Sequence, residues 1–274
     1  MNQNKFISQT LVLLFAFIYF TACQKSTEQL LSPNLQPDIS TARQNPEKLV
    51  VKKPRIEKII QHDLPFYYVP TRTGVFTYNK WGDPERIVFD FNSSDENTTN
   101  WIFRYNQKHQ LTDALKSYLA SYLVWSKYVY DHKGTIIRDT TQFFGQLQGE
   151  TPLPGMDTLV NIYSYDSQGR ISQVHRQWDN RSDDLFYNYD SNGNLTRTAY
   201  NTQGQPITLT YDNQVNPQRT HEVFMFVARD YSRNNAASAQ SYNDIGLPLA
   251  FRQQSRTALF LGADIATADI IYAR

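Results

Sequence analysis

Cysteine, surplus charge and long apolar runs are scarce in this 274-residue sequence. Its one cysteine, Cys23, cannot form an internal disulfide, so no disulfide framework is expected. The chain has 27 basic and 26 acidic residues, and Lys5 is the only charge before Cys23, so no positive surplus remains for binding nucleic acid. The longest apolar run, Leu11 to Phe20, has ten residues, whereas a membrane-spanning helix needs about 20.

Motifs of common catalytic and metal sites are also missing from the sequence. No two of its five histidines lie within five residues of each other, which excludes helical metal ligands at i and i+4. There is no G-x-S-x-G nucleophile elbow and no phosphate-binding G-x-x-x-x-G-K loop. The segment Asn188 to Gly193 imitates the start of a calcium loop, but Ala199 takes the twelfth position, where a glutamate is needed. We therefore expect no metal, no cofactor and no catalytic residues.

Aromatic residues, by contrast, are abundant. The 18 Tyr, 16 Phe and 4 Trp make up 14% of the chain, too much for a disordered protein. Tyr, Phe, Thr and Val suit pleated sheet, and the many Asn, Gln, Asp and Ser residues suit the turns between strands. The composition favours an all-β protein over a helix bundle.

The N-terminus has the pattern of a secretory signal peptide: Lys5 is followed by an apolar region within the usual length of about 7 to 15 residues. This region ends in Phe20-Thr-Ala-Cys23, which resembles a bacterial lipobox with Phe20 in place of the usual leucine. The resemblance implies that residues 1–22 are a lipoprotein signal peptide, that Cys23 receives diacylglycerol and that the new N-terminus is acylated. The alternative is an ordinary cleavage site followed by a buried thiol.

Residues 23–60 are interpreted as a flexible tether, because they hold four prolines among polar residues and have little apolar periodicity. A folded domain is expected over 61–274. Gln24 differs from the aspartate of the inner-membrane retention signal, so the anchor is expected in the outer membrane. Whether the protein faces the periplasm or the cell surface stays open.

A repeat dominates the rest of the chain. Tyr163 to Ile171 aligns with Tyr187 to Leu195, twenty-four residues later, and with Tyr128 to Ile136; all three contain Tyr-Asp-x-x-Gly-x-Ile/Leu. Weaker copies are Phe76 to Gly82, Phe103 to Leu111, Tyr200 to Gly204 and Tyr242 to Gly246.

Each copy predicts one β-hairpin. The Asp or Asn accepts a backbone hydrogen bond in a type I turn, and the glycine takes the positive φ that follows it. The flanking Tyr and Ile or Leu then pack across the two strand ends. His109 replaces glycine in one copy, so that turn is expected to be the least regular. The predicted turn residues are Tyr130, Asp131, Gly134, Tyr165, Asp166, Gly169, Tyr189, Asp190 and Gly193.

The Tyr-Asp-x-x-Gly-x-Ile/Leu frame resembles the YD repeats of RHS-type proteins, and more closely those of small YD-repeat lipoproteins of diderm bacteria. A Ser-x-Asn-Asn segment (232–235) and a last Tyr-Asn-x-x-Gly-x-Pro copy (242–248) follow in the same order. The resemblance covers roughly residues 75 to 274. It implies an extended, twisted antiparallel meander of hairpins, of largely unknown function.

The segment 111–124 is ambiguous. Its leucines and tyrosines fall at helical spacing, but Leu115, Leu119 and Leu123 also share one parity in a strand. We favour strand because hairpins flank the segment, with one short helix near 111–124 as the alternative.

Four aromatic residues are candidates for ligand binding. Alternation puts Tyr163 and Tyr187 on strand faces rich in tyrosine, which form either a core or an exposed platform together with Trp125 or Trp178. Aromatic faces stack on sugars without charge, which suits a neutral protein. Asp179, Asp183 and Asp184 form an acidic loop, either as a solvated turn or as part of a paired-carboxylate glycosidase.

The sequence thus predicts a non-catalytic, lipid-anchored protein of the cell envelope that binds or scaffolds, with a glycan or another envelope protein as its partner. The alternative is an envelope glycan hydrolase. Its signature would be two carboxylates about 5 to 10 Å apart in one aromatic-lined cleft.

Overall fold

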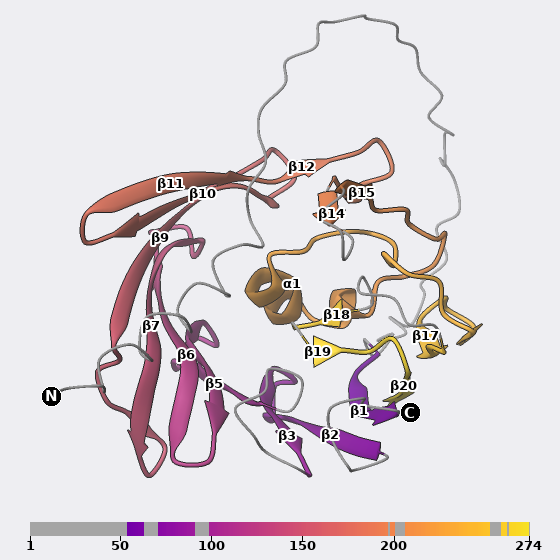
Figure 1. The fold of residues 1–274 in the computed structure, drawn as a ribbon, viewed down its shortest axis with the longest axis horizontal. Helices are drawn as coiled ribbons and strands as arrows, with labels where there is room; N and C mark the ends of the chain where they lie inside the picture. The colour runs from indigo at the N-terminus through magenta and orange to yellow at the C-terminus, as the bar shows by residue number, and fades with distance from the viewer. Residues whose placement is uncertain are drawn as a thin grey trace, which may run out of the picture. The chain divides into compact units, whose positions relative to one another are not determined.

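The protein forms a large antiparallel sheet, as the sequence predicts. The computed structural model describes residues 54–62, 71–90, 99–196, 198–200, 206–252, 259–261 and 263–273. Fourteen strands form the sheet, in the order β11-β10-β9-β7-β6-β5-β4-β3-β2-β1-β20-β17-β16, with β8 paired to β7 (Figure 1). These strands are β1 (Ile56–His62), β2 (Thr71–Tyr78), β3 (Pro84–Phe89), β4 (Asn100–Tyr105), β5 (Leu111–Tyr118), β6 (Ser121–Tyr130), β7 (Ile136–Gln148), β8 (Thr151–Pro152), β9 (Asp157–Tyr165), β10 (Ile171–Trp178), β11 (Arg181–Phe186), β16 (Ser241–Tyr242), β17 (Pro248–Ala250) and β20 (Ala268–Tyr272).

Three two-stranded ribbons and a short helical segment complete the described elements. The ribbons pair β12 with β13, β14 with β15, and β18 with β19. The helical segment consists of the 3₁₀ turn η1 (Pro217–Thr220) and the helix α1 (Glu222–Ala228). The ribbon strands are β12 (Asn188–Tyr189), β13 (Leu195–Thr196), β14 (Thr198–Tyr200), β15 (Pro206–Thr208), β18 (Leu259–Phe260) and β19 (Ala263–Asp264).

Two predictions about element positions need correction or resolution. The segment 111–124 is strand, forming β5 and the start of β6, and the helix alternative there is wrong. The predicted tether extends too far, because residues 56–60 belong to β1, which lies between β2 and β20 in the sheet. The apolar side chains of Ile56 and Ile59 are buried there, which explains why this segment joins the sheet.

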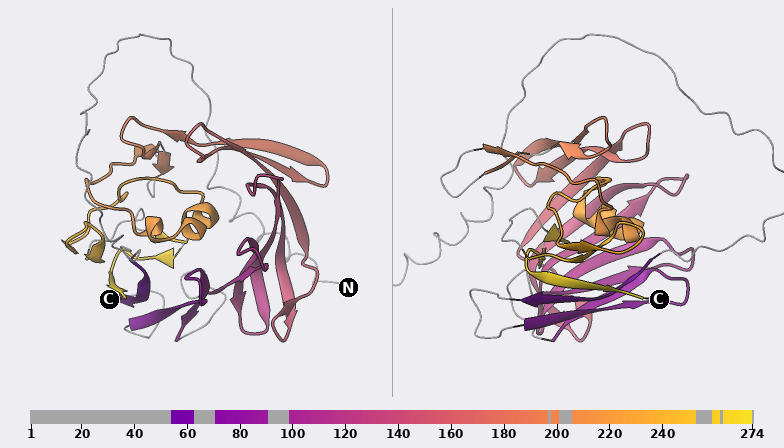
Figure 2. Two further views of the ribbon diagram at one scale, coloured as in Figure 1. Left: turned by 180° about the vertical axis from the view of Figure 1, so that it is seen from behind. Right: turned by 90° about the vertical axis from the view of Figure 1, so that its right-hand side faces the viewer.

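The main core lies between one face of the sheet and α1 (Figures 1 and 2). Phe224 of α1 is fully buried, with its ring centroid 6.0 Å from that of Phe76 on β2 and 6.2 Å from that of Phe103 on β4. Phe226 packs against Tyr128 of β6 and Tyr163 of β9. Burying each phenylalanine stabilises the folded state by about 1.5–3 kcal/mol. The helix α1 therefore joins strands from both halves of the curved sheet in one core. We call this side the inner face.

A smaller core lies on the opposite, outer face. Side chains alternate along a strand, so Leu115 points away from the inner residue Ala114. Leu115 packs with Tyr122 and Trp125. Residues 145–156, here called the flap, cover this cluster: the Tyr122 hydroxyl donates to the Leu153 carbonyl at 2.6 Å.

The repeat turns have the predicted chemistry. In the six described turns, the Asp or Asn carboxyl or amide oxygen accepts from backbone N–H groups two and four residues further on. Hydrogen bonding to the backbone N–H of Thr135 lowers the pKa of Asp131. The fourth residue has positive φ, 84° at Gly134, 75° at Gly169 and 82° at Gly193.

The turn at His109 follows the same pattern, so the prediction that it would be the least regular is wrong. His109 adopts φ 61°, and its N–H donates to the Asn106 carbonyl at 3.0 Å, as glycine does in the other turns. The predicted turn residues 201–205 of the Tyr200 copy lie outside the described residues, although Tyr200 and Pro206 pair in register.

Seven tyrosines of the described residues link successive hairpins. In each of the seven, the hydroxyl donates to the carbonyl of a residue near the start of an earlier strand, and in six of them that residue lies two positions after the positive-φ residue of an earlier repeat turn. We call these contacts the tyrosine relay. Its members are Tyr78 to Ile56, Tyr105 to Pro84, Tyr130 to Leu111, Tyr165 to Ile136, Tyr189 to Ile171, Tyr211 to Leu195 and Tyr272 to Pro248. The repeat tyrosine Tyr242 differs, because its hydroxyl donates to the Asp212 carboxylate.

Candidate functional site

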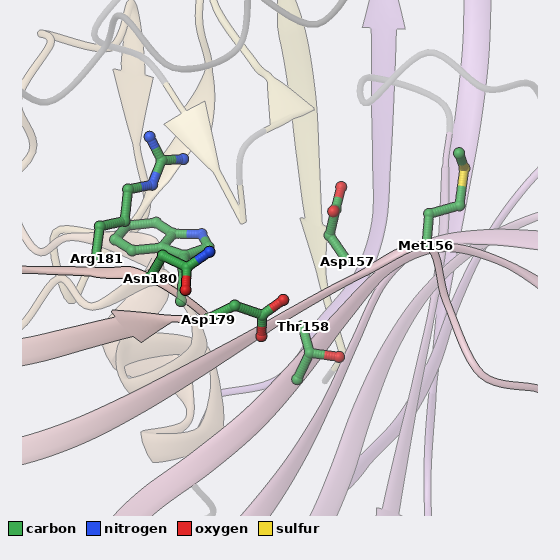
Figure 3. A pocket seen from close by; sticks show the side chains of 7 residues that line it. Met156, Asp157, Thr158, Asp179, Asn180 and Arg181 are labelled. Atoms are coloured by element: carbon green, nitrogen blue, oxygen red, sulfur yellow. The ribbon is translucent and has the colours of Figure 1, made fainter.

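An open pocket lies where β9 begins and β10 ends (Figure 3). Its volume is about 370 Å³. One wall comes from Met156, Asp157 and Thr158, and the other from the β10–β11 turn. The residues of this second wall are Trp178, Asp179, Asn180 and Arg181.

The pocket lies at one particular end of the sheet. Strand β9 runs from Asp157 to Tyr165, where a repeat turn begins, so Asp157 and Trp178 lie at the opposite end of the strands. The chain enters the sheet at the repeat-turn end, because Ile56 accepts the hydroxyl of Tyr78 beside a repeat turn. The pocket therefore lies at the end of the sheet away from the N-terminal entry.

Trp178 is held in the pocket by two arginines. The guanidinium carbons of Arg176 and Arg181 both lie 4.8 Å from the centroid of its ring, within the range of a cation–π contact. Arg176 is fixed by a bidentate ion pair with Asp183. Arg181 has no ion-pair partner within the described part of the chain, so its guanidinium remains able to donate hydrogen bonds to a ligand.

The carboxylates near the pocket divide into paired and unpaired groups. Asp183 pairs with Arg176, and Asp184 accepts from His175 at 2.9 Å, a hydrogen bond that lowers the pKa of Asp184. Asp157 and Asp179 line the pocket, are exposed, and have no hydrogen-bond or ion-pair partner among the residues that the structure describes. The acidic loop predicted from the sequence therefore contributes one pocket residue, Asp179, and two residues whose carboxylates have side-chain partners, Asp183 and Asp184.

The other candidate ligand-binding aromatics are core residues. Tyr163 is 7% exposed and packs on Phe226 of α1, and Tyr187 packs against the same inner cluster. Trp125 is 9% exposed and lies on the outer face, where its indole N–H donates to Asp113 at 3.1 Å. Of the four candidates, Trp178 alone lines this pocket.

A buried polar cluster on the inner face has a structural role. Asp139 is 1% exposed and accepts hydrogen bonds from Thr141, Asn161 and Tyr163. Arg229, which caps the C-terminus of α1, donates to the same Tyr163 hydroxyl at 3.2 Å. Burial, opposed by the charge of Arg229, raises the pKa of Tyr163. The cluster joins the end of α1 to β7 and β9, and neither described pocket reaches it.

Met156, Asp157 and Thr158 were not predicted as site residues. The register of the hairpin around the turn at Asp166 could have indicated them. Gln177 pairs with Val160, and continuing this register by two residues places Asp179 opposite Thr158. Met156 is the most exposed large apolar side chain described, at 81%, and only the pairing of two strands shows that it lines the same pocket as Trp178.

Comparison with known proteins assigns neither a family nor a function to this chain. A scan against protein-family models and a search of curated proteins both found no match. Within the described residues, no group of three His, Cys, Asp or Glu side chains is placed to hold a metal ion. No described helix is long and apolar enough to cross a membrane. Cys23, the expected lipidation site, lies outside the described residues.

Proposed function

We propose that this protein is a non-catalytic, lipid-anchored glycan-binding protein of the outer membrane, and that the Trp178 pocket is its binding site. The observation that carries the proposal is the partly exposed indole of Trp178 in a pocket lined by hydrogen-bonding side chains, Asp157, Thr158, Asn180 and Arg181 among them. An aromatic ring offers an apolar face, and a few polar groups orient the ligand, which is the usual composition of a small-ligand site.

The position of the pocket supports the same proposal. Acyl chains on Cys23 would hold the N-terminus at the membrane, with each buried CH₂ contributing about 0.8 kcal/mol. From Cys23 to Ile56 the chain can extend by roughly 110 Å at about 3.3 Å per residue. The tether would join the folded unit at the repeat-turn end of the sheet, whereas the Trp178 pocket lies at the opposite end of the strands.

The test of binding uses the mature lipoprotein in a detergent without a sugar headgroup, applied to an array of peptidoglycan fragments and bacterial surface polysaccharides. We expect Trp178→Ala to weaken binding about thirtyfold, as loss of about 2 kcal/mol at a buried aromatic anchor implies. Trp81→Ala is the matched control, because Trp81 is 56% exposed at the repeat-turn end. Equal binding by both variants and the parent would refute the site.

The anchor has its own test. Cys23→Ala is expected to abolish incorporation of labelled palmitate and to release the protein from the membrane fraction. Mass spectrometry that finds an unacylated mature N-terminus would refute the anchor without touching the pocket.

A second candidate function is glycan hydrolysis, because Asp157 and Asp179 line the Trp178 pocket together. A general acid needs an environment that disfavours its ionised form, such as an apolar pocket, whereas both carboxylates are exposed. Binding without cleavage is therefore the favoured function. New reducing ends released from a bound glycan, and lost in Asp157→Asn and Asp179→Asn, would establish the hydrolase instead.

A further inference from the structure

A second pocket, separate from the Trp178 pocket, lies between the Asp190 repeat turn and the segments 209–213 and 233–234. Its volume is about 410 Å³. Asp and Asn side chains supply most of its lining, with Arg233 and Tyr211. These segments come from three separate parts of the sequence, so the pocket exists only in the folded chain.

The frame of this pocket is held rigidly by hydrogen bonds. Asn194 and Asn234 bond reciprocally, with the Asn194 amide donating to the Asn234 side chain at 3.1 Å and the Asn234 N–H donating to Asn194 at 2.9 Å. Asp212 accepts from Asn235 and from the Tyr242 hydroxyl at 2.7 Å. This is the structural role of the Ser-x-Asn-Asn segment at 232–235: it fastens the C-terminal part of the chain to the Asp190 repeat turn.

Four further groups that line the pocket have no hydrogen-bond or ion-pair partner among the residues that the structure describes. Asp190 uses one carboxyl oxygen for the backbone of its own turn, and no bond is made by the other oxygen within the described residues. The side chains of Asn192, Asn213 and Arg233 likewise have no partner within the described ranges, and all three residues are exposed. A fixed frame thus presents one carboxylate oxygen, two amides and one guanidinium to the cavity.

The mixed chemistry of these groups selects the class of ligand. The carboxylates of Asp190 and Asp212 would repel an anion, and the positive charge of Arg233 would repel a metal ion. A neutral polyhydroxyl compound fits, because its hydroxyls donate to Asp190 and accept from Arg233, while the amides of Asn192 and Asn213 do both. Tyr211 and Leu209 add an apolar wall for the C–H face of a ring. We infer that this pocket binds a sugar residue, as a second site that makes the protein bivalent for glycans.

The inference is tested by NMR on the ¹⁵N-labelled mature lipoprotein in a detergent without a sugar headgroup. Glucose, galactose, mannose and N-acetylglucosamine are titrated separately. We expect at least one of them to shift the side-chain amide signals of Asn192 and Asn213. Arg233→Ala is expected to weaken this binding about tenfold, which is the loss of one hydrogen bond to a charged group. Its guanidinium has no partner among the described side chains, so the fold should be unchanged.

Two controls make the result decisive. Arg138→Ala removes an exposed arginine from β7 and should leave the titration unchanged. The indole signal of Trp178 reports on the first pocket, so failure of the proposed function appears separately from failure of this inference. The inference is overturned if none of the four sugars shifts the Asn192 and Asn213 amides, or if the shift persists with equal affinity in Arg233→Ala.

Discussion

The tyrosine relay predicts that the hydroxyls of its seven tyrosines, and not only their rings, stabilise the sheet. The sharpest case is Tyr130→Phe, which keeps the ring and removes the hydroxyl that donates to the Leu111 carbonyl at 3.0 Å. Leu111 is 4% exposed, so water cannot easily replace the lost donor. A net hydrogen bond contributes about 1 kcal/mol, and we expect this loss in the free energy of unfolding.

The effect should be measurable and additive. For a folded unit of about 200 residues, 1 kcal/mol lowers Tm by about 2–4 °C. Tyr130→Phe combined with Tyr272→Phe should lose about 2 kcal/mol, because β6 and β20 are separated by five strands in the sheet and distant sites add.

Urea unfolding followed by near-UV circular dichroism measures these losses. Tyr118→Phe is the matched control, because no hydrogen bond of the Tyr118 hydroxyl is found in the described part of the chain. If Tyr130→Phe and Tyr118→Phe unfold at the same urea concentration, the relay contributes nothing and the reasoning fails.

Three further predictions concern alkali, the flap and the buried carboxylate. Burial raises the pKa of Tyr105 and Tyr272, and raises that of Tyr130 to about 12. The folded state therefore gains its full stability from these protonated hydroxyls below pH 10, the pKa of tyrosine in the unfolded chain. This stability is lost as the pH rises from 10 through the raised pKa of the folded state. The free energy of unfolding measured by urea titration should fall between pH 10 and 11 by about 1 kcal/mol for each of Tyr105 and Tyr272, and a flat profile would contradict this. Gly155→Ala would place its Cβ 2.4 Å from the Phe143 carbonyl oxygen, so it should open the flap and lower the free energy of unfolding by more than about 2 kcal/mol. Gly169→Ala is the control and should lower it by about 1 kcal/mol, because the Cβ added there meets nothing within 4 Å. Limited proteolysis at residues 145–156 reports the opening of the flap. Asp139→Ala should cost about 3 kcal/mol by leaving Thr141, Asn161 and Tyr163 without their shared acceptor, and a loss below that of Tyr130→Phe would argue against a structural role for the cluster.

The local chemistry of the hairpins could be predicted from the sequence because it depends on a few adjacent residues. Asp131 and Gly134 specify their turn within five positions, and the same argument holds for each copy. His109 shows the limit of this argument, because a non-glycine residue adopts the same conformation within an otherwise matching turn.

Contacts between hairpins could not be predicted in the same way. Tyr130 reaches Leu111 and Tyr165 reaches Ile136 over separations of 19 and 29 residues, so no fixed spacing in the sequence reveals the relay. The same limit applies to the pocket, where Trp178 was recognised but its neighbours Met156 and Asp157 depend on the pairing of β9 with β10.

The helix α1 was not predicted because its seven residues, Glu222–Ala228, are too few to show helical periodicity. Isolated helices of this length are not stable in water, so the helix depends on the surrounding sheet. Its ends are set locally: His221 accepts from the Val223 N–H at 3.2 Å, and Arg229 ends it with φ 51°. The burial of Phe224 and Phe226 supplies the rest.

The position of β1 has a consequence for how this chain reaches its native state. One side of β1 pairs with the strand that follows it, but the other side pairs with β20, so that Ile59 meets Ile270. During synthesis, the backbone donors and acceptors on that side of β1 stay unpaired until β20 has been made, and unpaired strand edges of this kind recruit other chains. A chaperone that shields the early hairpins would therefore improve the yield of this protein more than one that acts only after β20 has been made.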